Sequence, residues 1–215
     1  MFRDRREAGR LLGHVLADLR GSDAVVLGLP RGGVVVAFEV ARLLDLPLEV
    51  IVVRKVGVPW QPEVAMGAVG EDGATIVNQG LLDSSRIDPQ VVAATQAHAW
   101  VELEHRVKAL RGDRPRIALH ARTAVVVDDG IATGATARVA CRVARALGAG
   151  KVIVAVPVAP QEATGAFAEV ADRVVCLRQP TDFGAVGRFY KDFRPVSDDQ
   201  VVHLLDVARR NPCRG

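Results

Sequence analysis

The stretch VVVDDGIATGAT, residues 125–136, joins an apolar run of strand length to the start of a helix through a loop of small residues. A run of valines is typical of a strand that is covered on both faces of a parallel sheet. Ligands of open α/β sheets bind outside the carboxyl ends of such strands, and here two carboxylates follow the valines directly. The stretch therefore predicts an α/β fold and the place of a binding site in it.

The end of this stretch has the features of an anion site. Gly130 and Gly134 allow close backbone approaches that a Cβ atom would block. The backbone N–H groups of residues 132–136 lie at the expected helix N-terminus, where the helix dipole favours an anion. Thr133 and Thr136 add hydroxyl donors. This end of the stretch therefore suits a monophosphate.

The two carboxylates suit another part of the same ligand. Asp128 and Asp129 would repel a phosphate, whereas they suit hydroxyl donors or a hydroxyl-bound Mg²⁺. A ribose 5-phosphate needs both kinds of group; the alternative is a chance strand–turn–helix with the acidic pair as a helix cap. The predicted ribose 5-phosphate site consists of Asp128, Asp129, Gly130, Ile131, Ala132, Thr133, Gly134, Ala135 and Thr136. Neither a Rossmann dinucleotide fingerprint nor a Walker loop occurs in the sequence.

A second glycine-containing loop, GLPRGG at residues 28–33, ends another apolar run of strand length. Arg31 supplies a fixed positive charge, and Gly32 and Gly33 expose backbone N–H groups at the start of the next expected helix. We therefore predict a second anion site at Pro30, Arg31, Gly32 and Gly33. A tight strand–helix turn is the alternative interpretation.

The rest of the chain alternates strands with helices. The expected strands are residues 24–29, 48–53, 74–78, 123–128, 151–157 and 173–177, and the expected helices are residues 4–20, 34–44, 88–111, 135–147, 160–170 and 198–209. A loop or irregular hairpin is expected at residues 54–73. The alternation predicts a doubly wound, mostly parallel sheet. We expect a single domain over residues 1–215, with its core at about 22–178 and a small C-terminal hood and helix at about 179–212.

Composition and charge exclude several classes of protein. The net charge of +3, without a basic run, argues against nucleic acid as a partner. No apolar run reaches the roughly 18 residues that span a bilayer, and the N-terminus lacks the apolar region of a signal peptide, so no membrane association is expected. Cys141, Cys176 and Cys213 match neither a metal motif nor a disulfide framework, which favours a reduced, cytoplasmic compartment.

Residues 125–136 resemble the 5-phosphoribosyl 1-diphosphate signature of type I phosphoribosyltransferases over all twelve positions. The chain is also similar to stand-alone bacterial members of that family in FRDR at 2–5, GLPRGG at 28–33, VRKVG at 53–57 and DF-x-x-VG at 182–187. The resemblance implies the type I phosphoribosyltransferase fold. It also implies Mg²⁺-dependent transfer of the phosphoribosyl group to a nitrogen nucleophile, expected to be a nucleobase, with release of pyrophosphate.

The resemblance implies roles for particular residues as well. The loop at 30–33 would bind the pyrophosphate, and in that family it often contains a cis peptide. Lys55, and after it Arg54, would neutralise the leaving pyrophosphate, unless both are solvated charges at a strand end. Asp128 and Asp129 would hold the ribose and, through its hydroxyls or water, the Mg²⁺. Catalysis would consist of positioning and charge neutralisation.

Residues 57–72 would form the flexible catalytic loop of that family. Glu63, Glu71 and Asp72 are expected to be solvated there, and binding of a base or a metal by one of them is the alternative. Trp60 either stacks on a ring or anchors the loop.

The C-terminal hood would recognise the nucleobase. Phe183 or Tyr190 would stack on it, and packing of these rings within the hood is the alternative. Two other functions stay open: a sensor or regulatory protein that binds phosphoribosyl diphosphate without turning it over, and a structural subunit of a larger assembly. The resemblance is also compatible with a homodimer.

Overall fold

The computed structural model of the chain describes residues 1–85 and 87–210, without the side chains of residues 62, 63 and 83–85. Its centre is a five-stranded sheet with the strand order β2-β1-β6-β7-β8. These strands are β1 (Val25–Gly28), β2 (Leu48–Val50), β6 (Thr123–Val127), β7 (Lys151–Val158) and β8 (Arg173–Arg178). All neighbouring pairs are parallel, which confirms the predicted sheet.

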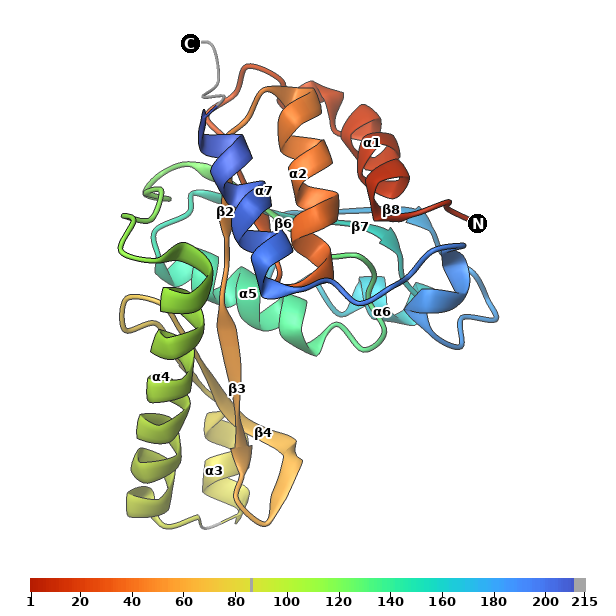
Figure 1. Ribbon diagram of the computed structural model, residues 1–215. Helices are drawn as coiled ribbons and strands as arrows, with labels where there is room; N and C mark the ends of the chain where they lie inside the picture. Colours follow the sequence, from red (N-terminus) through yellow and green to blue (C-terminus); the bar gives the residue numbers. More distant parts are fainter. Residues whose placement is uncertain (86, 211–215) are drawn as a thin grey trace.

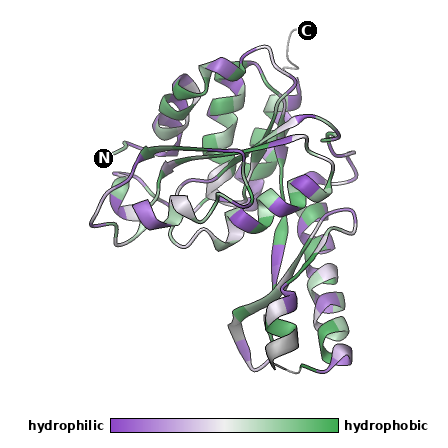
Figure 2. Ribbon diagram, turned by 180° about the vertical axis from the view of Figure 1, so that it is seen from behind, coloured by the Kyte–Doolittle hydropathy of each residue, from purple (hydrophilic) through white to green (hydrophobic). Residues whose placement is uncertain are grey.

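Helices cover both faces of this sheet (Figure 1). One face carries α1 (Arg5–Val15), α2 (Gly32–Leu44) and α7 (Asp198–Arg210), and the other carries α5 (Ala135–Ala146) and α6 (Gln161–Gly165). Because both faces are covered, β1 and β2 are buried at every position. In the view from behind, the strands of the sheet are mostly coloured as hydrophobic residues (Figure 2).

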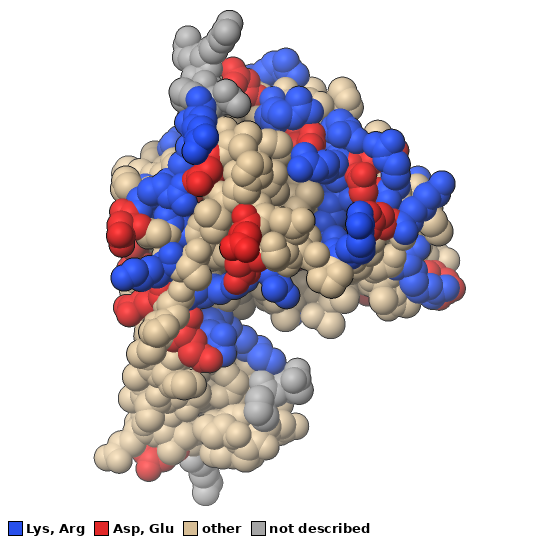
Figure 3. Space-filling model, viewed as in Figure 1, with Lys and Arg blue, Asp and Glu red and all other residues tan. Residues whose placement is uncertain are grey.

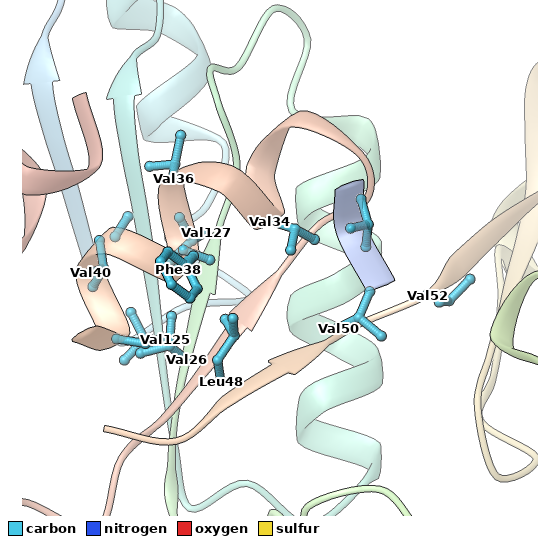
Figure 4. Packing of buried hydrophobic residues seen from close by; sticks show 14 of the residues in the cluster. Val26, Val34, Val36, Phe38, Val40, Leu48, Val50, Val52, Val125 and Val127 are labelled. Carbon is cyan, nitrogen blue, oxygen red and sulfur yellow. The ribbon is translucent and has the colours of Figure 1, made fainter. Parts of the chain in front are cut away.

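Two apolar clusters fill the space between the sheet and its helices. In the first cluster, Phe38 and Val40 of α2 belong with Val26, Leu48 and Val125 of the strands (Figure 4). The second cluster lies under α5 and α6. Helices therefore pack on both faces of the sheet through aliphatic side chains, as the valine-rich strands predict.

Short connecting elements complete the body. A 3₁₀ turn, η1 (Ala17–Leu19), follows α1, and a second one, η2 (Val186–Phe189), lies in the hood. Cys141 and Cys176 are free thiols, and Cys213 lies outside the described residues. Within the described part of the chain, no helix is both long enough and apolar enough to cross a membrane.

A second, antiparallel sheet projects from the body (Figure 1). It consists of β3 (Val53–Val58), β4 (Gln61–Gly70) and β5 (Thr75–Val77), and α3 (Gln79–Ser85) and α4 (Pro89–Arg111) accompany it. We call residues 53–111 the arm. Its helix α4 begins after Asp88, whose carboxylate accepts a hydrogen bond from the backbone N–H of Gln90 at 2.8 Å.

The arm confirms the irregular-hairpin form of the prediction for residues 54–73 and excludes a plain loop. β3 and β4 pair over most of their length, with register shifts on either side of Gly57. A Cβ atom on Gly67 would lie 2.4 Å from the carbonyl oxygen of Ile76, so this glycine permits the close pairing of β4 with β5. Glycines that suggest a loop in the sequence are therefore part of a sheet here.

A buried ion-pair network joins the arm to the body. Arg111, at the end of α4, donates hydrogen bonds to the carboxylates of Glu49, at 3.2 Å, and Glu71. Arg209 of α7 also donates to Glu49, at 3.1 Å. The expectation that Glu71 is solvated is wrong, because its charge is neutralised by Arg111 and the residue is only 5% exposed. Ionic groups that are this deeply buried need such partners.

Candidate active site

Two loops meet at the carboxyl ends of β1 and β6, which are neighbouring parallel strands. Asp128 and Asp129 follow β6 directly, and the loop at 30–33 follows β1. A Cβ atom on Gly33 would lie 2.8 Å from the Cα atom of Asp128, and one on Gly32 would lie 1.9 Å from Oδ2 of Asp129. The absence of side chains at these two glycines lets the predicted pyrophosphate loop touch the predicted ribose carboxylates.

The loop at 30–33 has the geometry of an anion site. The peptide bond between Pro30 and Arg31 is cis. Arg31 is exposed, and Gly32 and Gly33 are the first two residues of α2. The side chain of Arg31, the N-cap residue of this helix, makes no capping hydrogen bond, so the first backbone N–H groups of the helix are suited to an anionic ligand.

The loop after Asp129 leads to a second helix N-terminus. Gly134 adopts a left-handed backbone conformation, with φ of +74°, and a Cβ atom there would lie 3.1 Å from the ring of Phe167. The N-cap residue of α5, Gly134, has no side chain, and the hydroxyl of Thr133 accepts a hydrogen bond from the backbone N–H of Ala135 at 3.4 Å. The buried residues of the loop are Ile131 and Gly134, and the exposed ones near the helix start are Ala132, Thr133, Ala135 and Thr136. The exposed turn has the shape and the donors that a phosphate needs.

The carboxylate pair is asymmetric. Oδ1 of Asp128 accepts a hydrogen bond from the backbone N–H of Asp129 at 2.8 Å, and Oδ2 of Asp129 accepts one from Nε of Arg5 at 2.7 Å. Burial raises the pKa of Asp128 well above its usual range, and the charge of Asp129 raises it further. Burial also raises the pKa of Asp129, against the lowering effect of the hydrogen bond and charge of Arg5. Acidic groups perturbed in this way are typical of functional sites.

Comparison with known proteins identifies the family. The family model described as "Phosphoribosyl transferase domain" matches residues 4–194. The chain belongs to this family. It is 53% identical over 211 residues to "Putative phosphoribosyl transferase Rv0571c" of Mycobacterium tuberculosis strain H37Rv and, equally, to MT0597 of strain CDC 1551. These alignments cover 98% of this chain and 48% of each relative, so the chain spans about half the length of the curated relatives it matches.

A solved structure supports the same fold for this phosphoribosyl transferase domain. The crystal structure of TT1426 from Thermus thermophilus is 47% identical in sequence and has a TM-score of 0.87. The match covers 95% of this chain and 97% of that chain. Together with the family match, it confirms the predicted phosphoribosyltransferase fold over nearly the whole length.

In this phosphoribosyl transferase domain, Arg54 and Lys55 lie on opposite faces of β3, because side chains alternate along a strand. Arg54 forms an ion pair with Glu102 of α4 at 2.5 Å. Lys55 and Thr136 line one cavity of about 520 Å³ between the arm and α5. The space-filling view shows basic side chains in the notch between arm and body (Figure 3). The structure thus brings Lys55 near the phosphate loop and places Arg54 against α4.

The hood and the N-terminal segment support the acidic loop. The hydroxyl of Tyr190 donates to the backbone carbonyl oxygen of Asp129 at 2.5 Å, and burial raises the pKa of this hydroxyl. The ring of Tyr190 packs between Phe2 and Phe193, with centroid distances of 5.4 and 5.1 Å. Tyr190 is only 5% exposed and is therefore not placed to stack on a nucleobase.

The remaining predicted residues lie in three different places. Phe183 is half-buried and stacks on Phe189 of the hood, at a centroid distance of 5.4 Å. Trp60 lies in the turn between β3 and β4 and is 67% exposed. Asp72 pairs with Arg116, and the side chain of Glu63 lies outside the described residues.

Arg5 is the site residue that sequence reasoning missed. It contacts Asp129 across 124 positions of the chain, and nothing next to it in the sequence marks this contact. Its place in the FRDR motif of the resembling family is the only signal that could have drawn attention to it.

Proposed function

We propose that this domain transfers the 5-phosphoribosyl group from 5-phosphoribosyl 1-diphosphate to a nitrogen nucleophile of the nucleobase class and releases pyrophosphate. One observation carries the proposal: the loop at 30–33 lies against Asp128 and Asp129, with no side chain at Gly32 or Gly33 to separate them. A diphosphate on that loop would be next to a ribose on the carboxylates. The donor has its diphosphate and ribose hydroxyls in the same relation.

The proposed roles follow from the position of each group. The first turn of α5, with Thr133 and Thr136, would hold the 5-phosphate. Asp128 and Asp129 would accept hydrogen bonds from the ribose hydroxyls. Arg31 and the first N–H groups of α2 would face the diphosphate. These groups act by positioning the donor and by stabilising the charge that develops on the leaving pyrophosphate as the bond from C1 to oxygen breaks.

The carboxylate oxygens of the site are compatible with Mg²⁺ as the cofactor. Within the described residues, no group of three His, Cys, Asp or Glu side chains could enclose a metal ion. Mg²⁺ does not require such a group, since it commonly binds through one or two carboxylates together with substrate phosphates and water. Asp128 and Asp129 offer these oxygen donors. When bound, Mg²⁺ would neutralise part of the charge of the diphosphate.

Calorimetry in the presence of Mg²⁺ tests the donor assignment. We expect the wild-type protein to bind 5-phosphoribosyl 1-diphosphate and the double variant Asp128→Asn, Asp129→Asn to show no binding, because the ribose hydroxyls lose their charged acceptors. Asp113→Asn, at an exposed carboxylate of the same type, is the matched control and should bind as the wild type does. Unchanged affinity of the double variant would refute the assignment.

Turnover separates a transferase from a sensor. We expect pyrophosphate release when the donor and Mg²⁺ are supplied with a panel of purines, pyrimidines and small amines. Tight donor binding without release for every acceptor would favour the sensor. Because the curated relatives are about twice as long, the panel is best repeated with a full-length relative.

A further inference from the structure

We propose that Arg5 is a catalytic residue whose guanidinium contacts the diphosphate of the donor. The inference rests on the proposed function and adds a residue to it from the N-terminus of the chain. Three observations carry it: the place of the guanidinium, the way it is held, and the charge it meets.

The guanidinium of Arg5 lies between the two halves of the site. Its Nε is 2.7 Å from Oδ2 of Asp129, and it would be 2.8 Å from a Cβ atom on Gly32. The carboxylate that would hold the ribose and the loop that would hold the diphosphate therefore both border this one cation. In the donor, the diphosphate is attached at C1, next to the 2′-hydroxyl, so a group in this place would lie beside the bond that breaks.

The side chain of Arg5 is held in a fixed orientation. Nη1 donates to the carbonyl oxygen of Arg194 at 2.9 Å, and the guanidinium carbon lies 3.8 Å from the ring centroid of Phe193. Within the described residues, Nη2 donates no hydrogen bond, and it shares with Nε the edge that faces Asp129. Nη2 is therefore the guanidinium nitrogen left to donate to a phosphate oxygen, and the side chain of Arg5 is only 11% exposed.

The positive charge of Arg5 offsets the negative charge of the site. The half-buried carboxylates of Asp128 and Asp129 would repel a diphosphate, and Arg5 neutralises one of them. Two other charged groups of the hood, Asp192 and Arg194, pair with each other at 2.6 Å. Tyr190 approaches Asp129 as a neutral hydroxyl. Arg5 therefore reduces the negative charge that a polyanion meets at the carboxylates, in addition to the exposed Arg31 of the neighbouring loop.

A purely structural role for Arg5 is the competing explanation. Arg5 could serve only to tie the N-terminal segment to the hood and so to hold Asp129 in place. In that case its loss would weaken every ligand of the carboxylates to a similar degree. If Arg5 contacts the diphosphate, its loss should instead weaken the binding only of ligands that contain a diphosphate.

Calorimetry with Mg²⁺ and three ligands distinguishes these explanations: 5-phosphoribosyl 1-diphosphate, inorganic pyrophosphate and ribose 5-phosphate. We expect Arg5→Gln to weaken binding of the first two by at least about tenfold, the scale of a lost hydrogen bond to a charged group, and ribose 5-phosphate by less than about threefold. Arg6→Gln is the matched control, because Arg6 pairs with Glu39 at 3.1 Å and its side chain is 51% exposed. It should change no affinity by more than about twofold.

Arg5→Lys keeps the charge but lacks the planar fork, so it should also weaken pyrophosphate more than ribose 5-phosphate. This variant decides the question if Arg5→Gln does not fold. Equal losses for pyrophosphate and ribose 5-phosphate, or wild-type affinity of either variant for pyrophosphate, would overturn the inference and leave the proposed function intact. A wild-type protein that does not bind 5-phosphoribosyl 1-diphosphate would overturn both.

Discussion

Gly32 is the point of contact between the two loops of the site, and alanine at this position tests that contact. The added Cβ atom would lie 1.9 Å from Oδ2 of Asp129 and 2.8 Å from Nε of Arg5. Cβ atoms do not come closer than 3.0 Å to other heavy atoms, so the carboxylate or the loop must move by about 1.1 Å. A misplacement of about 1 Å costs on the order of 100-fold in rate, or about 2.7 kcal/mol. The overpacking itself should destabilise the fold by about 1–3 kcal/mol.

Gly165→Ala is the control for this variant. Gly165 ends α6, has open space where a Cβ atom would be added, and is not among the positive-φ glycines, so alanine should leave stability unchanged or raise it by up to about 1 kcal/mol. Calorimetric affinity for 5-phosphoribosyl 1-diphosphate with Mg²⁺, the rate of pyrophosphate release and the midpoint of thermal unfolding should be measured for both variants. If Gly32→Ala kept the affinity and the rate of Gly165→Ala, the close contact of the two loops would be refuted.

Three other variants test separate parts of the structure. The pKa of Asp128 is raised above its ordinary 3.8, so ionisation of this carboxyl lowers the stability of the fold as pH rises from 3.8 through the raised value. The free energy of unfolding of Asp128→Asn, measured with urea, should therefore be about 1 kcal/mol above that of the wild type at pH 8 and should converge with it towards acid pH. A difference between the two proteins that narrows as pH rises would contradict this. Arg111→Met leaves the carboxylates of Glu49 and Glu71 buried beside an apolar side chain and should lower the free energy of unfolding by about 3–5 kcal/mol. A loss below about 1 kcal/mol would show that the buried ion-pair network contributes little to stability. Lys55→Gln should slow pyrophosphate release by about 100-fold, whereas Arg54→Gln should stay within about twofold of the wild type, and equal effects would contradict the different placement of the two side chains.

Local sequence was sufficient to predict the parallel sheet and the two glycine loops. The valine runs around Val26 and Val125 predict buried strands, because a strand covered on both faces has no polar side to alternate with. The acidic pair and the glycines that follow it are contiguous, so their shared place at one strand end could be inferred without a structure.

Groups that meet only in space could not be predicted in this way. Arg5 and Tyr190 reach Asp129 across 124 and 61 positions of the chain, and neither has a local pattern that marks the contact. The sequence predicts a solvated Glu71, because its partner Arg111 lies 40 positions away and cannot be recognised locally. In the arm, glycines and prolines indicate a loop or an irregular hairpin, and local sequence cannot decide between them because it does not show the strand partner that accommodates these residues.

The contacts of Arg5 and Tyr190 with Asp129, and of Phe2 with Tyr190, join the two ends of the chain and therefore form late in synthesis. A chain that stops after β8 contains every strand of the parallel sheet, but Tyr190 and Phe193 have not yet been synthesised. The acidic loop would then lack its hydroxyl donor, and Arg5 would lack the ring and the carbonyl oxygen that orient it. Donor binding would therefore report that the hood has packed behind Asp129 rather than that the sheet has formed. Because truncation after β8 also removes α7 and its ion pair from Arg209 to Glu49, Tyr190→Phe in the full chain is the change that separates the two events.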